Sequence, residues 1–257
     1  MSVPTVLVHR DAGVLAQAVA ARLITRLVDA QAARGSAHLV LTGGGMGIAT
    51  LAAVAATPAR DAVDWRRLDI WWGDERFLPA GDPERNETGA RQALLDQVGV
   101  DPARVHPMAG PDSGLTPEES AAWYAEELAA AARPEDHGPV PSFDVLLLGV
   151  GPDGHVASLF PEMPALHDER PVTAVHGSPK PPPTRITLTR PSIAAAREVW
   201  LVAAGADKAT AVHLALQGAG PIQVPAAGAR GRAGTLFMLD RAAAGKLPAS
   251  LVRSAAR

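Results

Sequence analysis

A glycine-rich turn in the middle of the chain carries an acid and an imidazole two positions apart. The apolar run Leu146–Leu148 is typical of a buried strand, and it leads into a turn that contains Asp153, Gly154 and His155. Ligands bind at strand ends in open α/β sheets, because the loops there vary over a rigid scaffold. Since an imidazole titrates near neutral pH, His155 in this turn is suited to proton transfer.

Two further polar clusters follow predicted strands. Asp74-Glu75-Arg76 follows the predicted strand 68–72 after a single glycine, Gly73, and this position at a strand end favours a role in a site over a chance surface cluster. A glycine turn at 42–47 precedes an alanine-rich helix, so its backbone N–H groups and the helix N-terminus are suited to an anion. The turn lacks the Gly-Lys-Ser/Thr of a P-loop and does not match G-x-G-x-x-G, so a plain tight turn is the alternative.

Lysine is rare in this chain, and two of the lysines lie in segments suited to bind an anion. Of the 24 lysine and arginine residues, only three are lysines: Lys180, Lys208 and Lys246. Lys180 shares the proline-rich segment 178–185 with Arg185, and we expect a stiff loop that presents both charges to an anion. A PxxP ligand for an SH3 domain is the alternative for this segment, although it leads directly into a predicted strand. Lys208 opens a predicted helix, either beside the same anion or on a solvated helix face.

The sequence predicts neither a metal site nor a serine nucleophile. Asp153 and His155 alone are too few for zinc, and no HExxH motif or third ligand at a recognisable spacing accompanies them. The chain contains no cysteine, so it has no disulfide and no thiolate ligand. Ser158 is not part of a G-x-S-x-G motif, so we do not expect it to act as a nucleophile.

The elements that must position these residues alternate between strands and helices. Apolar strands are predicted near residues 6–8, 38–41, 68–72, 143–150, 172–175, 186–188, 199–203 and 235–239, with a short helix closing the chain. A long helix from Asp11 stops at Gly35, and another begins at Thr116, where Glu119 completes a capping box. This pattern predicts an α/β fold with a three-layer, largely parallel, Rossmann-like sheet and helices on both faces. No segment is long enough for a domain linker, so we expect a single domain over residues 1–257.

Composition and charge are those of an ordinary globular protein. The chain is 47% hydrophobic and 20% charged, and its formal net charge of -3 gives no basis for binding nucleic acid or an anionic membrane. No apolar run approaches the ~20 residues that span a bilayer, and the first residues do not read as a signal peptide. We therefore expect a cytoplasmic protein. The sequence leaves its oligomeric state open between a monomer and a weak dimer.

Five blocks, in the correct order and spread over most of the chain, together resemble one family. The blocks are LTGGGMG, WWGDERFLPAGDPERN, LLLGVGPDGHVASLFP, SPKPPPTRITLT and GADKATAV. On these blocks the chain resembles the 6-phosphogluconolactonase family, within the larger group that includes glucosamine-6-phosphate isomerase/deaminase. The resemblance implies a glucosamine-6-phosphate isomerase-like fold. It also implies hydrolysis of 6-phosphoglucono-δ-lactone to 6-phosphogluconate in the oxidative pentose phosphate pathway, with no cofactor.

The resemblance also implies which residues form the site. The family's proposed catalytic histidine falls on His155. The implied phosphate- and substrate-binding residues are Thr42, Gly43, Gly44, Gly45, Lys180, Arg185 and Lys208. In one departure, Gly45 and Met46 stand where the family commonly carries a Ser-Thr pair, which removes two hydroxyls from the glycine turn but leaves its backbone donors.

The residues after His155 favour a lactonase over an isomerase. The isomerases carry a phenylalanine, an asparagine and a glutamate where this chain has Ser158, Leu159 and Phe160, and a phenylalanine cannot serve as acid or base. Arg76 likewise replaces a residue that is usually aromatic in the isomerases. An aminosugar-phosphate isomerase/deaminase and a non-catalytic sugar-phosphate sensor are the alternatives. The net charge and the lack of a basic helix-turn-helix argue against the sensor.

Opening a lactone requires a deprotonated water, a stabilised tetrahedral oxyanion and a proton for the leaving ring oxygen. We expect neutral His155 to take the proton from water and return it to that oxygen. Asp153 or Asp74 is expected to orient the ring, and Arg76 to stabilise the oxyanion.

Overall fold

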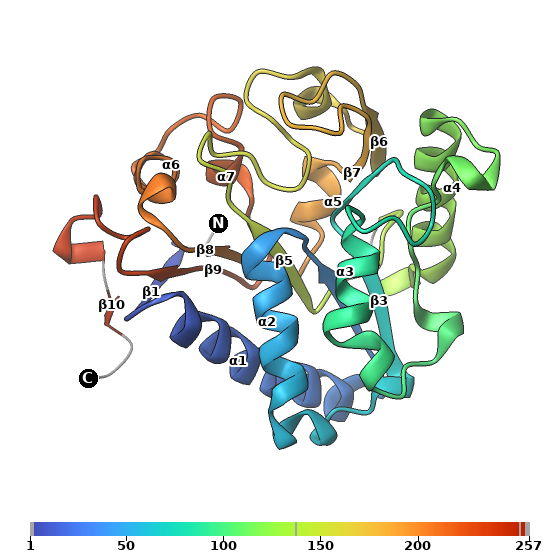
Figure 1. Ribbon diagram of the computed structural model, residues 1–257, viewed down its shortest axis with the longest axis horizontal. Helices are drawn as coiled ribbons and strands as arrows, with labels where there is room; N and C mark the ends of the chain where they lie inside the picture. Colours follow the sequence, from blue (N-terminus) through green and yellow to red (C-terminus); the bar gives the residue numbers. More distant parts are fainter. Residues whose placement is uncertain (1–2, 137, 252, 255–257) are drawn as a thin grey trace.

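A seven-stranded sheet forms the centre of the molecule (Figure 1). The computed structural model describes residues 3–136, 138–251 and 253–254. In sheet order the strands are β10 (Arg253–Ser254), β1 (Thr5–His9), β9 (Gly234–Asp240), β8 (Glu198–Ala203), β5 (Val145–Gly149), β2 (Ala37–Leu41) and β3 (Leu68–Trp72). Every neighbouring pair is parallel. The carboxyl ends of all seven strands therefore meet at one edge of the sheet.

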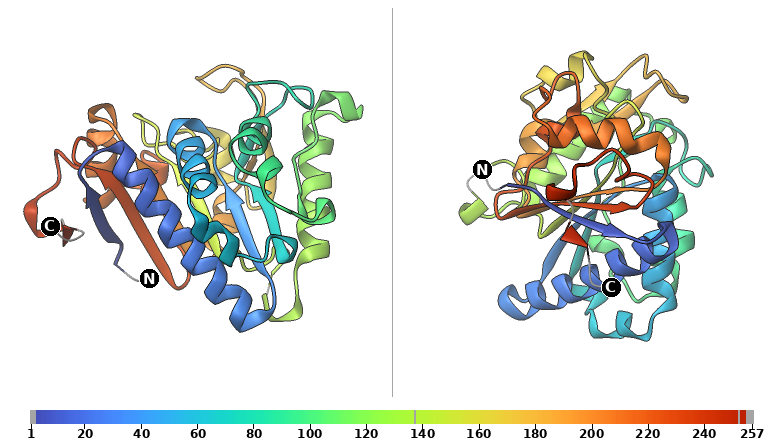
Figure 2. Two further views of the ribbon diagram at one scale, coloured as in Figure 1. Left: turned by 60° about the horizontal axis from the view of Figure 1, so that its bottom comes forward. Right: turned by 90° about the vertical axis from the view of Figure 1, so that its left-hand side faces the viewer.

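Helices cover both faces of this sheet, as the two views in Figure 2 show. One face carries α1 (Ala12–Arg34), α2 (Gly44–Ala56) and α3 (Asn86–Ala93). The other carries α4 (Pro117–Ala131), α5 (Arg190–Ala194), α6 (Ala209–Leu216) and α7 (Pro225–Gly228). The predicted three-layer α/β fold is confirmed. No helix in the described part of the chain is long and apolar enough to cross a membrane.

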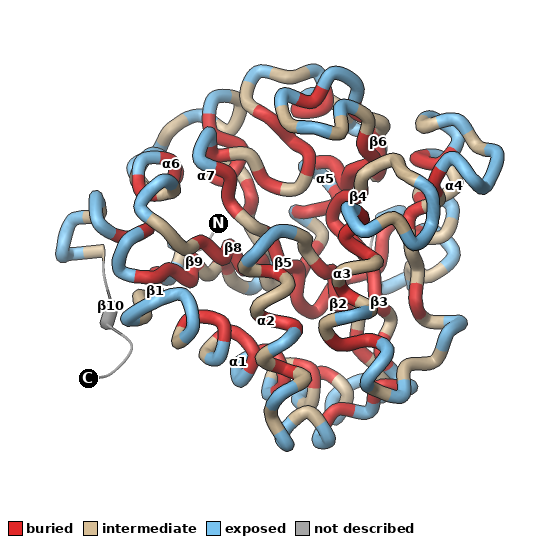
Figure 3. The backbone as a smooth tube through the Cα atoms, viewed as in Figure 1, coloured by how far each residue is buried: buried red, intermediate tan, exposed pale blue. Residues whose placement is uncertain are grey.

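Alternate side chains of each central strand enter different cores. In β5, Leu146 and Leu148 belong to the core beneath α4–α7, whereas Val145 and Leu147 belong to the core beneath α1–α3. A strand buried on both faces is apolar at successive positions, which explains the uninterrupted apolar runs in the sequence. Figure 3 shows the buried backbone along these central strands, with connecting loops and outer helix turns exposed.

The helix ends follow the predicted signals. Asp11 caps α1 by accepting a hydrogen bond from the Val14 N–H (2.8 Å), and Gly35 ends the helix in the left-handed region at φ 78°. At the start of α4, Thr116 Oγ1 accepts from the Glu119 N–H, and Glu119 Oε2 accepts from the Thr116 N–H. Both pairings satisfy backbone donors that a helix leaves free in its first turn.

Two features differ from the sequence prediction. A second, three-stranded antiparallel sheet consists of β4 (Asp74–Arg76), β7 (Arg185–Leu188) and β6 (Val172–Val175). The chain also continues past β9 into β10, which adds a parallel strand at the edge of the main sheet. The small sheet joins the segment after β3 to the segment that contains Lys180 and Arg185, and so brings two predicted site segments together.

Candidate active site

A cavity of about 540 Å³ lies where β2, β5 and β8 reach their carboxyl ends. The small antiparallel sheet supplies part of its wall. All but one of the predicted site residues line it: Thr42, Gly43, Gly44, Gly45, Asp74, Arg76, His155, Lys180, Arg185 and Lys208. Asp153 is the exception: it does not line the cavity but forms a hydrogen bond with His155, which does. Residues from five separate segments of the chain thus meet in one place.

The glycine turn follows the end of β2 and leads into the first turn of α2. Gly43 is the N-cap of α2, and no side chain caps this helix end. The Thr42 hydroxyl accepts a hydrogen bond from the Gly149 N–H (3.2 Å), which ties the turn to the end of β5. Because the first N–H groups of a helix lack partners within the helix and carry positive partial charge, this wall of the cavity favours an anion.

Asp153 and His155 form a close pair at the edge of the cavity. Asp153 Oδ1 lies 2.5 Å from His155 Nδ1 and also accepts from the His155 N–H at 3.3 Å. Partial burial opposes ionisation of Asp153, but its hydrogen bonds with His155 outweigh this effect and hold its pKa at about 2. An ionised carboxylate only accepts hydrogen bonds, so Nδ1 of the neutral ring carries the proton and Nε2 is left as an acceptor.

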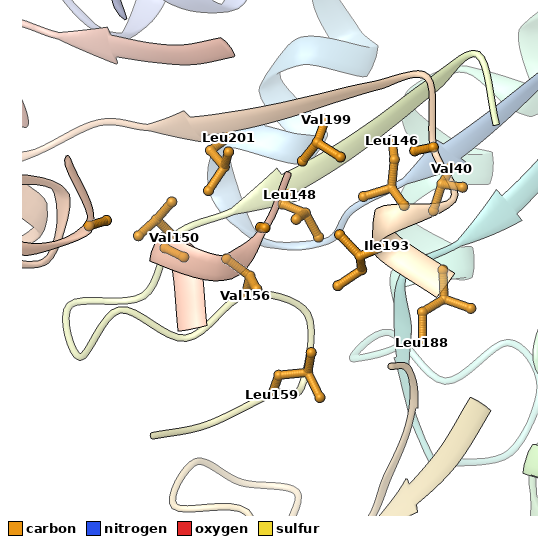
Figure 4. Close-up of a cluster of buried hydrophobic side chains, with 14 of the residues drawn as sticks. Val40, Leu146, Leu148, Val150, Val156, Leu159, Leu188, Ile193, Val199 and Leu201 are labelled. Carbon is orange, nitrogen blue, oxygen red and sulfur yellow. The ribbon is translucent and has the colours of Figure 1, made fainter. Parts of the chain in front are cut away.

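The turn that carries His155 is anchored by its neighbours in sequence. Gly154 has φ 86°, and a Cβ there would lie 2.8 Å from a methyl group of Val224, so this position requires glycine. Val156 and Leu159 are each 1% exposed and pack beneath Leu148 in the cluster of Figure 4. The buried side chains hold the loop against the end of β5.

The Phe160 ring packs against both His155 and the Arg185 guanidinium. Its ring centroid lies 4.5 Å from that of His155, and the Arg185 guanidinium carbon lies 5.7 Å from the same centroid. Phe160 is 1% exposed, so it is a packing residue in this site. Arg185 also donates to the carbonyl oxygens of Lys180 and Pro181, each at 3.1 Å, and so fixes the shape of the proline-rich loop.

Four cations line the cavity. Arg76 lies on β4 and Arg185 begins β7, whereas Lys180 comes from the β6–β7 connection and Lys208 from the turn after β8. Burial lowers the pKa of Lys180, as do the charges of Lys208 and Arg185, while Asp153 raises it. Lys208 Nζ lies 2.9 Å from Asp207 Oδ2, a carboxylate that also lines the cavity. Two carboxylates, those of Asp74 and Asp207, also line the cavity, so its four cations leave the lining with a net positive charge.

The cluster Asp74-Glu75-Arg76 is a strand, not a loop. Since side chains alternate along a strand, Asp74 and Arg76 both face the cavity while Glu75 is buried behind them. Asp74 Oδ2 accepts a hydrogen bond from the Ser158 hydroxyl (2.6 Å). Arg76 donates to the carbonyl oxygen of Glu84, which fixes the position of its guanidinium.

Sequence reasoning missed Asn86 and Asp207, which also line the cavity. Asn86 is the last residue of the block WWGDERFLPAGDPERN, and Asp207 belongs to GADKATAV, so both stood in motifs already singled out. Their contacts with the cavity arise only when distant segments fold together. Among the described residues, no group of three or more His, Asp or Glu side chains is arranged to hold a metal ion.

A parallel α/β sheet with a cationic cavity at its carboxyl edge and an Asp–His pair beside it is the arrangement of an α/β enzyme suited to a small anionic substrate. The family described as glucosamine-6-phosphate isomerases/6-phosphogluconolactonase matches residues 10–238. The chain belongs to this family.

Relatives with similar sequences cover nearly the whole chain. A 6-phosphogluconolactonase of Streptomyces coelicolor is 67% identical over 251 residues, 96% of each chain. One from Mycobacterium tuberculosis is 51% identical and covers 93% of this chain and 96% of its own.

Solved structures agree in fold. The structure of a Trypanosoma brucei 6-phosphogluconolactonase matches with a TM-score of 0.80 at 30% identity, over 95% of this chain and 99% of that one. A monomeric glucosamine-6-phosphate deaminase matches with a TM-score of 0.75 over 94% of this chain and 99% of its own, but at 18% identity it shows the fold alone.

Proposed function

We propose that the protein hydrolyses 6-phosphoglucono-δ-lactone to 6-phosphogluconate, the lactone-opening step of the oxidative pentose phosphate pathway. Curated relatives named for this activity cover nearly the full chain at 67% and 51% identity. The observation that carries the proposal is the position of His155: it lines the same cavity as Lys180, Arg185 and Lys208. A proton acceptor and several cations thus line one cavity, which supports the proposal that a single phosphorylated substrate contacts both.

The proposed reaction begins with a water molecule beside His155 Nε2. This nitrogen takes a proton from the water while the water oxygen bonds to the lactone carbonyl carbon, giving a tetrahedral oxyanion. The bond from that carbon to the ring oxygen then breaks, and the proton moves from His155 to the leaving oxygen. The products are a free hydroxyl and a carboxylic acid, which ionises. Asp153 holds Nδ1 protonated throughout, so that Nε2 is the atom that exchanges the proton.

The remaining residues bind and orient the substrate in this proposal. Lys180, Arg185 and Lys208, with backbone N–H groups of the turn 42–45, bind the phosphate. Arg76 stabilises the oxyanion, because a fixed cation in a partly buried site favours charge that develops in the transition state. The reaction uses no metal and no cofactor in this account, and we place it in the cytoplasm.

The isomerase alternative is disfavoured by Phe160. This residue stands where the sibling isomerases carry a glutamate, and its ring packs on His155 and Arg185. A phenyl ring neither donates nor accepts a proton, so the site lacks the second acid or base of an isomerase. The sensor alternative leaves the Asp153–His155 pair without a role, since a binding protein has no need of a proton acceptor.

The test is lactone hydrolysis followed by pH-stat on the purified protein. Because this lactone hydrolyses spontaneously, the rate is compared with a no-enzyme control and with a heat-inactivated sample. We expect hydrolysis well above both controls and no ammonia release from glucosamine 6-phosphate. Hydrolysis at the spontaneous rate contradicts the proposal, and ammonia release supports the isomerase instead.

A further inference from the structure

Asn86 lines the cavity but has no role in the mechanism above. It begins α3 and is 6% exposed. Its Nδ2 donates to the Asp74 carbonyl oxygen at 2.8 Å and lies 3.5 Å from Asp74 Oδ1. Because a carbonyl oxygen only accepts hydrogen bonds, the Asn86 amide must turn its NH₂ side toward Asp74 and its Oδ1 the other way.

The Oδ1 of Asn86 lies against the glycine turn. A Cβ on Gly43 would come within 1.8 Å of this oxygen, so the amide occupies the space that the missing side chain leaves. Within the described part of the chain, no hydrogen bond to Asn86 Oδ1 is formed. A free acceptor therefore lies at the cavity wall, between Asp74 and the turn 42–45.

Glu75 fixes the backbone that carries Asn86. Its Oε1 accepts from the N–H groups of Asn86 (2.7 Å) and Arg76 (2.8 Å), and its Oε2 accepts from the Glu87 N–H (2.9 Å). The N-cap residue of α3, Arg85, makes no capping hydrogen bond with its own side chain. Glu75 of β4 therefore replaces the local cap, and α3 starts at a position set by β4.

The neighbouring Asp74 presents a second acceptor to the cavity. The Ser158 hydroxyl donates to Asp74 Oδ2 at 2.6 Å, and the Arg185 guanidinium lies 3.9 Å from the same oxygen. Asp74 Oδ1 has only the 3.5 Å contact with Asn86, which is too long to satisfy it. This part of the wall therefore consists of two acceptors, one of them negatively charged. A phosphate dianion has acceptor oxygens and no donor, so it forms no hydrogen bond with either oxygen, whereas a hydroxyl group can donate to each of them.

We propose that Asn86 Oδ1 and Asp74 Oδ1 form a subsite that binds hydroxyl groups of the sugar chain, while Lys180 and Lys208 bind the phosphate. This inference rests on the proposed function and deepens it, because it assigns a polyhydroxy ligand to a defined wall of the cavity. Asn86 is thus a substrate-binding residue, and Glu75 is the residue that positions it.

The experiment compares two ligands by NMR titration: 6-phosphogluconate, which carries both hydroxyls and phosphate, and inorganic phosphate. Asn86→Ala should weaken binding of 6-phosphogluconate about fivefold, the effect of one neutral hydrogen bond, and leave the affinity for inorganic phosphate unchanged. Lys208→Ala is the matched comparison and should weaken both. Asn86→Ser, a smaller perturbation, is titrated alongside, and far-UV circular dichroism verifies the fold of each variant.

The proposal is overturned if Asn86→Ala binds both ligands as the wild type does, or loses affinity for both equally. It is overturned without any variant if the wild type binds 6-phosphogluconate no more tightly than inorganic phosphate. The wild-type lactonase rate separates this inference from the proposed function. If the wild type hydrolyses the lactone but the Asn86 variants bind 6-phosphogluconate and inorganic phosphate with unchanged or equally reduced affinity, only the hydroxyl subsite is rejected. If the wild type does not hydrolyse the lactone, the proposed function itself is rejected.

Discussion

Two aspartates near the cavity have different partners, and we assign them different roles on that basis. Asp153 is paired with His155 and does not line the cavity, whereas Asp74 lines it and is held by Ser158. The sequence alone left open which of the two orients the substrate. The contacts favour Asp153 as the residue that orients the imidazole and Asp74 as the one that faces the ligand.

The role of Lys208 in phosphate binding can be tested by substitution, because a second lysine outside the cavity, Lys246, serves as a matched control. Lys208→Ala removes a cation from the cavity wall and should raise KM for the lactone about tenfold, with little change in kcat, because the phosphate is bound equally in the ground and transition states. Lys246, whose Nζ donates to Thr210 Oγ1 away from the cavity, is the control. Steady-state kinetics of both variants check this, and an unchanged KM for Lys208→Ala removes it from the phosphate site.

Elements with strong local signals were predictable from the sequence. The capping box at Thr116 and the stop at Gly35 depend on residues close in the chain, and both were found where expected. The strands near 172–175 and 186–188 were predicted, but their pairing with Asp74–Arg76 in a separate antiparallel sheet was not. All four residues of β7 are buried, and an apolar strand without an alternating pattern does not indicate which sheet it joins. Asn86 was missed for a related reason: its partners, Asp74 and Gly43, are distant in sequence.

The capping box of α4 should make a measurable contribution to the stability of the protein. Thr116→Ala removes the hydroxyl that accepts from the Glu119 N–H and should destabilise the protein by about 1 kcal/mol, which lowers Tm by roughly 2–4 °C in a protein of this size. Thr25→Ala in α1 is the matched control, because the Thr25 hydroxyl donates to its own helix at Ala21 and caps nothing. Differential scanning calorimetry measures both. Equal Tm values for the two variants would show that this cap does not contribute.

For the whole molecule, the parallel sheet explains why distant segments share one site. The residues that follow β2, β5 and β8 all emerge at the same edge, and the small antiparallel sheet closes that edge with Arg76 and Arg185 on paired strands. The fold class, a largely parallel sheet with helices on both faces, was predictable from the alternation of strands and helices in the sequence. The order of the strands in the sheet was not predictable, because the sequence of a buried apolar strand does not indicate which strands lie beside it. The single-domain organisation stays a prediction.

The free energy of unfolding should depend on pH in a way that reflects the burial of the Glu75 carboxyl. Burial raises the pKa of this carboxyl from 4.5 to about 7, although Arg85 and three backbone N–H groups oppose the shift. The folded state thus binds the proton more tightly than the unfolded state, so the contribution of Glu75 is fully present below pH 4.5 and is lost as pH rises through 7. The difference in unfolding free energy between wild type and Glu75→Gln should therefore fall from pH 4.5 to 7.

Urea denaturation at several pH values measures this difference. Glu126→Gln, at an exposed position on α4, is the control and should give a difference that is flat over the same range. A wild-type advantage over Glu75→Gln that grows with pH would mean that the Glu75 carboxyl has a lowered pKa in the folded protein.

The central claim is that His155 transfers the proton during lactone opening. The most direct measurement is the rate of 6-phosphoglucono-δ-lactone hydrolysis by His155→Ala, corrected for the spontaneous reaction, with His176→Ala as a control outside the cavity. Loss of a positioned general base should lower kcat by roughly 10²–10⁴-fold and leave binding of 6-phosphogluconate close to that of the wild type. A His155→Ala variant that turns over the lactone at the wild-type rate would contradict the account.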